Sequence, residues 1–203
     1  MLGICGKCGN HEWDKEVTGE QIRCPKCGNT WSFIRSPLFI LTGCSGVGKT
    51  TTGIQIMKNT TDVVVLDADM FYIIMPGETT EDNYAQIEQI QSLSKNIMQS
   101  GKPVLWTMAG NLDKLHHTYY RRFFSEIYCL ALVCDEEALR KRMTEGRGIT
   151  DQDWIQSSVD YNNYFKTHTS LEDTQFEVFD ITGKTVEEVA KYVVAWMKTK
   201  YGH

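Results

Sequence analysis

One stretch of the sequence decides the fold: residues 43–50 read Gly43-Cys44-Ser45-Gly46-Val47-Gly48-Lys49-Thr50. It follows an apolar run, Leu38–Thr42, and leads into a segment of helical character. Glycines let the backbone turn tightly so that its N–H groups face a phosphate, and the N-terminus of the next helix adds partial positive charge there. This strand, loop and helix therefore predict a site that holds the phosphates of a nucleotide.

Each residue type in the loop has an expected role. Lys49 should reach the β- and γ-phosphates of ATP, and the Thr50 hydroxyl should bind Mg²⁺. The other expected nucleotide contacts in and beside the loop are Gly43, Ser45, Gly46, Val47, Gly48 and Thr51. Cys44 is interpreted as a small residue that fills its position, and a thiol acidified by the helix N-terminus is the alternative.

Apolar strands alternate with longer helical stretches from residue 38 onward, which is the pattern of βαβ units. The predicted strands span residues 38–42, 63–67, 103–108, 127–133 and 176–179. The predicted helices span residues 49–58, 81–99, 112–124, 136–145, 151–165 and 186–200. We therefore expect an α/β, three-layer P-loop NTPase fold with a five-stranded parallel sheet over residues 36–203, because Arg35-Ser36-Pro37 suits a joint.

Two carboxylates follow the second predicted strand, at Asp67 and Asp69. Side chains two residues apart point the same way from an extended chain, and the carboxyl ends of parallel strands meet at one sheet edge. The third strand ends in Thr107-Met108 and lacks the terminal aspartate that could help to bind Mg²⁺. Asp67 is therefore expected to support Mg²⁺ together with Thr50. A solvated strand end or a helix cap is the alternative for both acids.

The sequence excludes one large class of nucleotide-binding proteins. It contains no Asn-Lys-x-Asp motif, which reads guanine. Asp180-Ile181-Thr182-Gly183 matches the Asp-x-x-Gly spelling of a GTPase, but it follows the last predicted strand, too late in the chain for a switch. We conclude that the protein is not a GTPase.

The phosphate loop, the Asp67-x-Asp69 pair and the basic stretch Arg140-Lys141-Arg142-x4-Arg147 carry a family resemblance. On these motifs, residues 38 to about 200 resemble the small P-loop kinases of the nucleoside and nucleotide kinase superfamily. Shikimate, gluconate and adenylylsulfate kinases are among its branches. The resemblance implies an ATP-dependent phosphotransferase, in which the first aspartate assists Mg²⁺ through water and the second contacts the acceptor hydroxyl. Asp67 and Asp69 match these positions.

The basic stretch follows the fourth strand, where these kinases carry a mobile lid. Charge spreads over the γ-phosphoryl oxygens during transfer, so a kinase needs cations that arrive when the site closes. We expect Arg142 and Arg147 to act in catalysis and Arg140 to contact the nucleotide. The alternative is a solvated helix face on which Glu136 and Glu137 pair with basic residues one turn further on.

Two further segments are assigned by this resemblance and by position. The turn Asp180–Lys184 resembles the one that lies against adenine, so Thr182 and Gly183 are expected there, and a plain helix-entry turn is the alternative. Residues 70–76 are apolar and aromatic and should line the acceptor pocket, with Ala109-Gly110-Asn111 facing it. Such a lining favours a nucleoside, a nucleotide or a similar metabolite, unless these residues merely pack against the adjoining helix.

Four of the seven cysteines form the pattern Cys5-x2-Cys8-x15-Cys24-x2-Cys27, the spacing of a four-thiolate zinc ribbon. A module of residues 1–35 buries too little core to fold alone, so Zn²⁺ is expected to stabilise it. Its five basic and four acidic side chains, four thiolates and a Zn²⁺ sum to about −1, which suits a nucleic-acid backbone poorly. A protein-docking or structural role is expected.

Composition sets the remaining limits. The net charge is −5, with 41% hydrophobic and 23% charged residues, as in an ordinary globular protein. No apolar run approaches the roughly 20 residues of a membrane span, and we expect a cytoplasmic protein without a membrane partner. The favoured function is small-molecule phosphorylation by Mg-ATP. The alternatives are a nucleic-acid 5′-end kinase or processing factor and a non-catalytic nucleotide-binding regulator that docks a partner through the ribbon.

Overall fold

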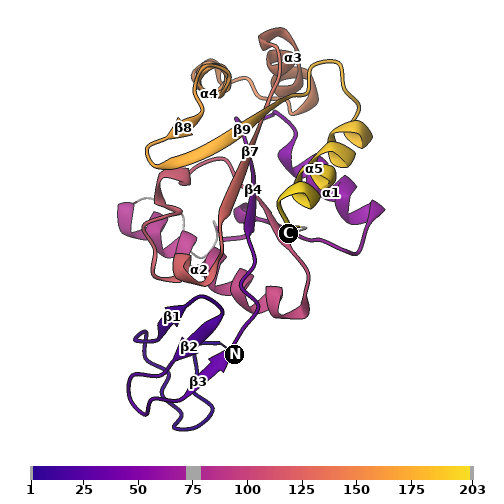
Figure 1. The fold of residues 1–203 in the computed structure, drawn as a ribbon. Coiled ribbons are helices and arrows are strands. Elements are labelled where there is room, and N and C mark those ends of the chain that lie inside the picture. The colour runs from indigo at the N-terminus through magenta and orange to yellow at the C-terminus, as the bar shows by residue number, and fades with distance from the viewer. Residues whose placement is uncertain (1, 72–78, 202–203) are drawn as a thin grey trace.

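The computed structural model describes residues 2–71 and 79–201. Figure 1 shows a small module of three strands at one end of a larger α/β unit. The module contains β1 (Glu16–Thr18), β2 (Gln21–Arg23) and β3 (Thr30–Ser32), which form an antiparallel sheet in that order. The larger unit begins with the next strand, β4 (Leu38–Thr42).

The larger sheet follows the order β5-β6-β4-β7-β9-β8. Its strands besides β4 are β5 (Val64–Asp67), β6 (Val104–Thr107), β7 (Ile127–Val133), β8 (Ser170–Leu171) and β9 (Thr174–Asp180). Neighbouring strands from β5 to β9 pair in parallel, so all five predicted strands are present.

The predicted count of five strands was wrong, because the sheet has a sixth strand, β8, which pairs antiparallel with β9. Only Glu172 and Asp173 separate the two strands, and Glu172 has a φ of 51°, in the left-handed region that tight hairpins use. A strand of two residues is too short to show an alternating pattern in the sequence, so periodicity could not reveal it.

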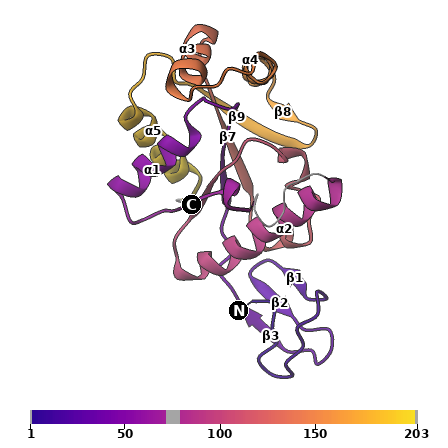
Figure 2. The same cartoon turned by 180° about the vertical axis from the view of Figure 1, so that it is seen from behind.

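Five α-helices surround the sheet in the described part of the chain (Figure 2). They are α1 (Lys49–Asn59), α2 (Thr80–Ile97), α3 (Glu136–Lys141), α4 (Gln152–Thr167) and α5 (Val186–Tyr201). Alternate residues of β4 point to opposite faces: Phe39 and Leu41 join a core with α1 and α5, whereas Leu38 and Ile40 join a core with α2. The result is the expected three-layer arrangement.

The predicted helix over residues 112–124 was wrong. Two short 3₁₀-helices, η3 (Leu112–Lys114) and η4 (Tyr119–Phe123), occupy this stretch. The Glu88 carboxylate accepts the N–H groups of Tyr119 and Tyr120, and the Gln91 amide donates to the Leu115 carbonyl. Side chains of α2 thus replace the backbone partners that a continuous helix would supply.

The small module packs against the end of the larger unit at which β4 begins. Leu2, Ile22 and Phe33 share an apolar cluster with Phe123 of η4. The Gln99 side chain accepts from the Ile34 N–H at 2.9 Å and donates to the Ile34 carbonyl at 3.0 Å. These contacts hold the module at the end of the sheet where β4 begins, opposite the loop that follows β4.

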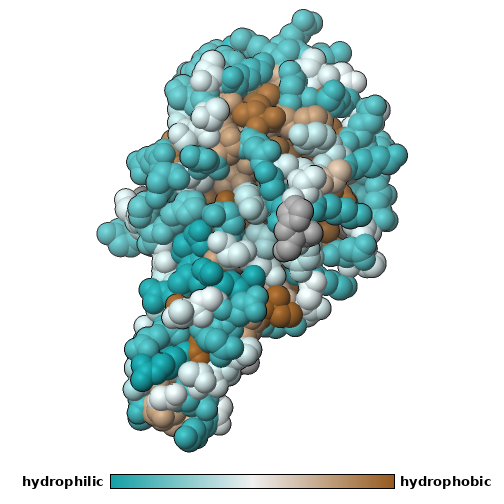
Figure 3. All heavy atoms as spheres, in the orientation of Figure 1, coloured by the Kyte–Doolittle hydropathy of each residue, from teal (hydrophilic) through white to brown (hydrophobic). Residues whose placement is uncertain are grey.

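The surface of the molecule is mainly hydrophilic on the face drawn in Figure 3, where apolar side chains form small separate patches. Among the helices of residues 2–71 and 79–201, none combines the length and the apolar character needed to cross a bilayer.

Candidate nucleotide and metal sites

The loop between β4 and α1 has no room for a Cβ atom at two of its positions with positive φ. Gly43 has a φ of 134°, and a Cβ atom there would lie 2.5 Å from the Leu132 carbonyl oxygen. Gly46 has a φ of 78°, and a Cβ atom there would lie 2.7 Å from the Met143 side chain. The loop is therefore held tightly between β7 and the segment after α3, which explains why the motif carries these glycines.

Lys49 and Cys44 show how the loop is arranged internally. The Lys49 ammonium donates to the carbonyl oxygens of Gly43 and Cys44 at 2.9 and 2.8 Å, so it is held against the start of the loop. Burial lowers the pKa of Lys49. Burial raises the pKa of the Cys44 thiol to about 12, so this cysteine is a buried space-filling residue and the acidified-thiol alternative is wrong.

The acid pair lies beside the start of α1. The Thr50 hydroxyl donates to one Asp67 carboxylate oxygen at 2.9 Å, and the Asp69 N–H donates to the other at 3.0 Å. Asp67 thus caps the 3₁₀-helix η1 (Ala68–Phe71) through the Asp69 N–H. It also accepts a hydrogen bond from Thr50, the predicted Mg²⁺ ligand. Partial burial and the charge of Asp67 raise the pKa of Asp69, while Lys49 and Arg147 oppose that rise.

Two of the three arginines of the basic stretch contact the phosphate loop, and the third does not. Arg142 donates to the Val47 carbonyl at 3.2 Å, and Arg147 donates to the Ser45 hydroxyl at 2.9 Å. Arg142 begins a π-helical turn, η5 (Arg142–Gly146), a rare element that is frequent at functional sites. Arg140 instead pairs with Glu136 at 2.8 Å, as the solvated-face alternative predicts.

One cavity of about 1170 Å³ joins these groups. Its lining includes most of the predicted nucleotide, Mg²⁺ and catalytic residues: Ser45, Gly46, Val47, Gly48, Lys49, Thr50, Thr51, Asp67, Asp69, Arg142 and Arg147. Gly43, the first residue of the loop, does not line the cavity. The arrangement places hydroxyl and carboxylate oxygens, a lysine and two arginines around one space, as a bound nucleoside triphosphate with Mg²⁺ requires.

Arg140, Thr182 and Gly183 lie outside this lining, although the sequence predicts them as nucleotide contacts. Thr182 is engaged elsewhere: its N–H donates to Asp180 at 2.8 Å and its hydroxyl accepts from the Asp135 N–H at 2.9 Å. The neighbouring Ile181 and Lys184 line the cavity instead. The turn thus reaches the cavity, but through other residues than those predicted.

Trp154 is a lining residue that the sequence analysis missed. It lies on α4, is 46% exposed, and has the Arg147 guanidinium 5.8 Å from the centre of its ring. Exposed tryptophan is unusual because its large apolar area favours burial. The sequence signal that could have revealed this residue was a tryptophan that follows the basic stretch of residues 140–147 after a short segment.

The predicted acceptor segment is described only in part. Residues 72–76 of it lie outside the described residues, whereas Met70 is exposed and Phe71 stacks on Trp106. Asn111 donates to the side chains of Asn83 and Gln86 at 3.0 and 3.1 Å. This contact joins the loop after β6 to α2 near the carboxyl edge of the sheet.

Thr107 supports a prediction about Mg²⁺. Its hydroxyl oxygen is buried without a hydrogen-bond partner among residues 2–71 and 79–201, it lines the cavity, and it pairs in register with Asp67. Thr107→Val should leave folding intact or improve it, because an unpaired buried hydroxyl costs roughly 1–3 kcal/mol. It should also raise the Mg²⁺ concentration needed for nucleotide binding several-fold, since the hydroxyl can bind a metal-bound water.

A fluorescent ATP analogue titrated at several Mg²⁺ concentrations measures this effect. Thr167→Val, at an exposed position near the end of α4, serves as the control. An unchanged Mg²⁺ dependence in Thr107→Val would rule out this role for the hydroxyl.

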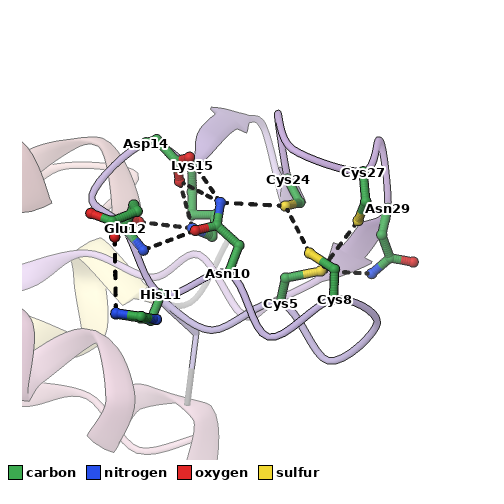
Figure 4. Close-up of polar contacts among 10 residues, drawn as sticks. All are labelled: Cys5, Cys8, Asn10, His11, Glu12, Asp14, Lys15, Cys24, Cys27 and Asn29. Carbon is green, nitrogen blue, oxygen red and sulfur yellow. Dashed lines mark hydrogen bonds and ion pairs between the residues drawn. The ribbon is translucent and has the colours of Figure 1, made fainter.

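The four cysteines of the small module meet at one point, as Figure 4 shows. Their sulfur atoms all lie within 4.8 Å of one another, with Cys5–Cys27 and Cys8–Cys24 separations of 3.7 Å. Disulfide sulfurs lie only about 2.05 Å apart. Tetrahedral zinc with Zn–S distances of roughly 2.3 Å needs sulfurs roughly 3.8 Å apart, so the cluster fits Zn²⁺.

The cluster is built from two matching turns, at residues 5–10 and 24–29, which both read Cys-x-Lys-Cys-Gly-Asn. In each turn the glycine N–H donates to the first cysteine carbonyl at 2.8 Å. Each asparagine points to the other turn: Asn10 lies 3.6 Å from the Cys24 sulfur and Asn29 lies 3.8 Å from the Cys5 sulfur (Figure 4). These amide donors can stabilise thiolates and a bound metal.

Comparison with known proteins agrees with the fold. A family model described as an AAA domain matches residues 38–153. A search of curated protein sequences finds no match. Among solved structures, an unliganded sugar kinase from Janibacter sp. is similar with 18% identity and a TM-score of 0.58, over 81% of this chain and 95% of that one.

Two other similar structures are of kinases with named substrates. A gluconokinase from Sinorhizobium meliloti is 17% identical with a TM-score of 0.56, covering 82% of this chain and 94% of the other. The APS kinase of Mycobacterium tuberculosis, bound to AMPPNP and APS, is 12% identical with a TM-score of 0.56, covering 81% and 99%. At these identities the structures establish the fold alone. From the match over residues 38–153, we conclude that the chain belongs to the AAA domain family.

Proposed function

We propose that the protein is a kinase that transfers the γ-phosphoryl group of Mg-ATP to a small-molecule acceptor. One observation carries the proposal: the phosphate loop, the Asp67 and Asp69 carboxylates and two arginines line a single cavity. A regulator that only binds nucleotide needs the loop but has no use for a second carboxylate at the acceptor side. The kinase fold of the similar structures supports the same proposal.

Each group has a proposed task in the reaction. Lys49 and the loop N–H groups hold the β- and γ-phosphates, while Thr50 and Asp67 hold the metal site. Bound Mg²⁺ would offset charge on the phosphate oxygens. Asp69 orients the acceptor hydroxyl and accepts its proton, and the raised pKa makes this carboxylate a better base than a fully solvated one.

Arg142 and Arg147 provide the cations that stabilise charge on the transferred group. They already contact the loop through Val47 and Ser45. We expect both to turn from these loop atoms toward phosphate oxygens when nucleotide is present, because a charge-assisted bond is stronger than one to a neutral acceptor.

The position of the ribbon favours a small acceptor over a nucleic-acid end. The ribbon lies at the edge where β4 begins, and the phosphate loop follows the other end of the same five-residue strand. Such a strand spans roughly 17 Å. A ribbon that gripped a polymer would lie beside the acceptor site, so we propose that it has a structural role. The four clustered thiols fit a reducing compartment such as the cytoplasm.

A screen of ATP consumption tests the proposed acceptor class. Nucleosides, nucleotides, sugar acids and 5′-hydroxyl oligonucleotides are added separately to the zinc-loaded protein with Mg-ATP, and ADP formation is followed. We expect a nucleoside, a nucleotide or a similar metabolite to raise ADP formation well above the rate without acceptor. Stimulation by oligonucleotides alone would favour the nucleic-acid end kinase instead.

A further inference from the structure

A second cavity, of about 260 Å³, lies between the ribbon and the larger unit. Residues 3, 4 and 11–13 line it from the ribbon, α2 contributes Ser92, Lys95 and Asn96, and η4 contributes Tyr119, Tyr120 and Phe123. No nucleotide-site residue takes part in it. The cavity is therefore a feature of the joint between the two parts of the chain and is separate from the proposed kinase site.

Lys95 is the unusual residue in this cavity. Its side chain is only 4% exposed, and no carboxylate within residues 2–71 and 79–201 pairs with its ammonium group, which keeps some solvent contact where Lys95 lines the cavity. Its neighbours are aromatic: the ammonium nitrogen lies 4.7 Å from the Tyr120 ring centre and 5.6 Å from that of Phe123. Ring faces compensate only part of the cost of removing an ammonium from water.

The other walls restrict the chemistry of an occupant. Trp13 stacks on Tyr119 with ring centres 5.6 Å apart, and its 61% exposure leaves ring surface open. Glu12 also lines the cavity, and its negative charge disfavours a ligand with two or more negative charges. Lys95 is the single lysine or arginine in this lining, within the described part of the chain.

We propose that this cavity binds a small organic monoanion with a flat apolar body, its carboxylate on Lys95 and its apolar part against the exposed surface of Trp13. An anion next to Lys95 would pair with its charge, and the open ring surface of Trp13 would take up the planar part. Because five of the eleven described lining residues come from the ribbon, such a ligand would also hold the ribbon against the larger unit. The proposal does not depend on kinase activity.

The charge state of Lys95 gives the site a pH signature. Burial lowers the pKa of Lys95 to about 8, whereas a bound carboxylate favours the charged ammonium. Affinity should therefore fall as the pH rises above about 8. The other titratable or charged groups around the cavity are His11, Glu12, Glu88, Tyr119, Tyr120 and Arg122. If these groups contribute to the pH dependence of affinity, their contribution would persist in a variant that lacks only the Lys95 ammonium.

Benzoate is a suitable probe, with benzamide as its neutral counterpart and inorganic phosphate as an anion without a ring. Calorimetric titration of the full-length, zinc-loaded protein without nucleotide should give a benzoate Kd of ~0.1–1 mM. Lys95→Met should weaken benzoate at least about tenfold and abolish the fall in affinity above pH 8. Lys102→Met, the same change at an exposed position, should bind benzoate like the unmodified protein.

Three results would overturn the proposal: no saturable binding of benzoate, equal binding by Lys95→Met, or phosphate or benzamide binding as tightly as benzoate. Zinc content verifies that the ribbon of Lys95→Met is folded. If it is not, Trp13→Ala gives an independent test at an exposed wall of the cavity, where benzoate affinity should fall several-fold. Unchanged benzoate affinity in Trp13→Ala would also contradict the proposal.

Discussion

Asp69→Asn should reduce phosphoryl transfer by a factor of ~10²–10⁴ while leaving the Kd for ATP within about a factor of two. Asparagine keeps the size of the side chain and its place at the cavity, but it cannot accept the acceptor proton. Among the described residues, the Asp69 carboxylate makes no hydrogen bond to the loop, and the contact of this residue with Asp67 is made by its backbone N–H. Nucleotide binding and catalysis should therefore separate in this variant.

The pH profile adds a second readout. Because the pKa of Asp69 is raised, the carboxylate takes up a proton at a higher pH than an ordinary aspartate. The rate should fall as the pH decreases through that raised pKa, and Asp69→Asn should lack this limb of the profile. Asp62→Asn, an exposed aspartate before β5, is the control and should behave like the unmodified protein. Transfer at an unchanged rate in Asp69→Asn would refute the assigned role.

Removal of one cysteine should have the largest effect on the ribbon. Structural zinc in small peptides contributes roughly 10–16 kcal/mol, or about 3 kcal/mol per thiolate, so Cys24→Ser should weaken zinc binding on the order of 100-fold. The cluster of Leu2, Ile22 and Phe33 would then lose its support and expose Phe123. The larger unit should stay folded, because its two cores are separate from this cluster.

Elemental analysis and thermal unfolding measure these two effects. Cys129→Ala changes a buried cysteine of β7 outside the cluster and should keep one zinc per chain. A ribbon that stays folded in the protein when it contains no metal would contradict the zinc-ribbon assignment.

Local patterns in the sequence were sufficient to predict the part of the fold around the phosphate loop. The run Leu38–Thr42 is buried throughout and becomes β4 with the predicted bounds, since a strand covered on both faces reads as continuous apolar sequence. The predicted start of α1 at Lys49 also agrees with the structure. Both depend on short stretches of chain, where residue type and spacing carry the information.

Other features depend on contacts between distant residues, which spacing does not report. Residues 112–124 lose their continuous helix because Glu88 and Gln91 bind their backbone from another element. Similarly, Thr182 is hydrogen-bonded to Asp180 and Asp135, Arg140 is paired with Glu136, and neither residue lines the cavity.

The cysteine spacing predicted which four thiols meet, but not how the two turns support each other. That each asparagine lies near a sulfur of the opposite turn follows from their packing, although the repeated Cys-x-Lys-Cys-Gly-Asn pattern was a signal that the two turns are alike. The place of the ribbon on α2 and η4 depends on Trp13, Phe33 and Phe123, and pairing between aromatic residues so far apart cannot be deduced from one sequence.

The fate of the γ-phosphoryl group tests the central claim most directly. The protein is incubated with Mg²⁺, ATP labelled in the γ-phosphate and the acceptor that most stimulates ADP formation, and the labelled products are separated. We predict that the label appears in the acceptor and that Asp69→Asn transfers at least about 100-fold less of it. Label that appears only in inorganic phosphate with every acceptor, or equal labelling by Asp69→Asn, would contradict the account.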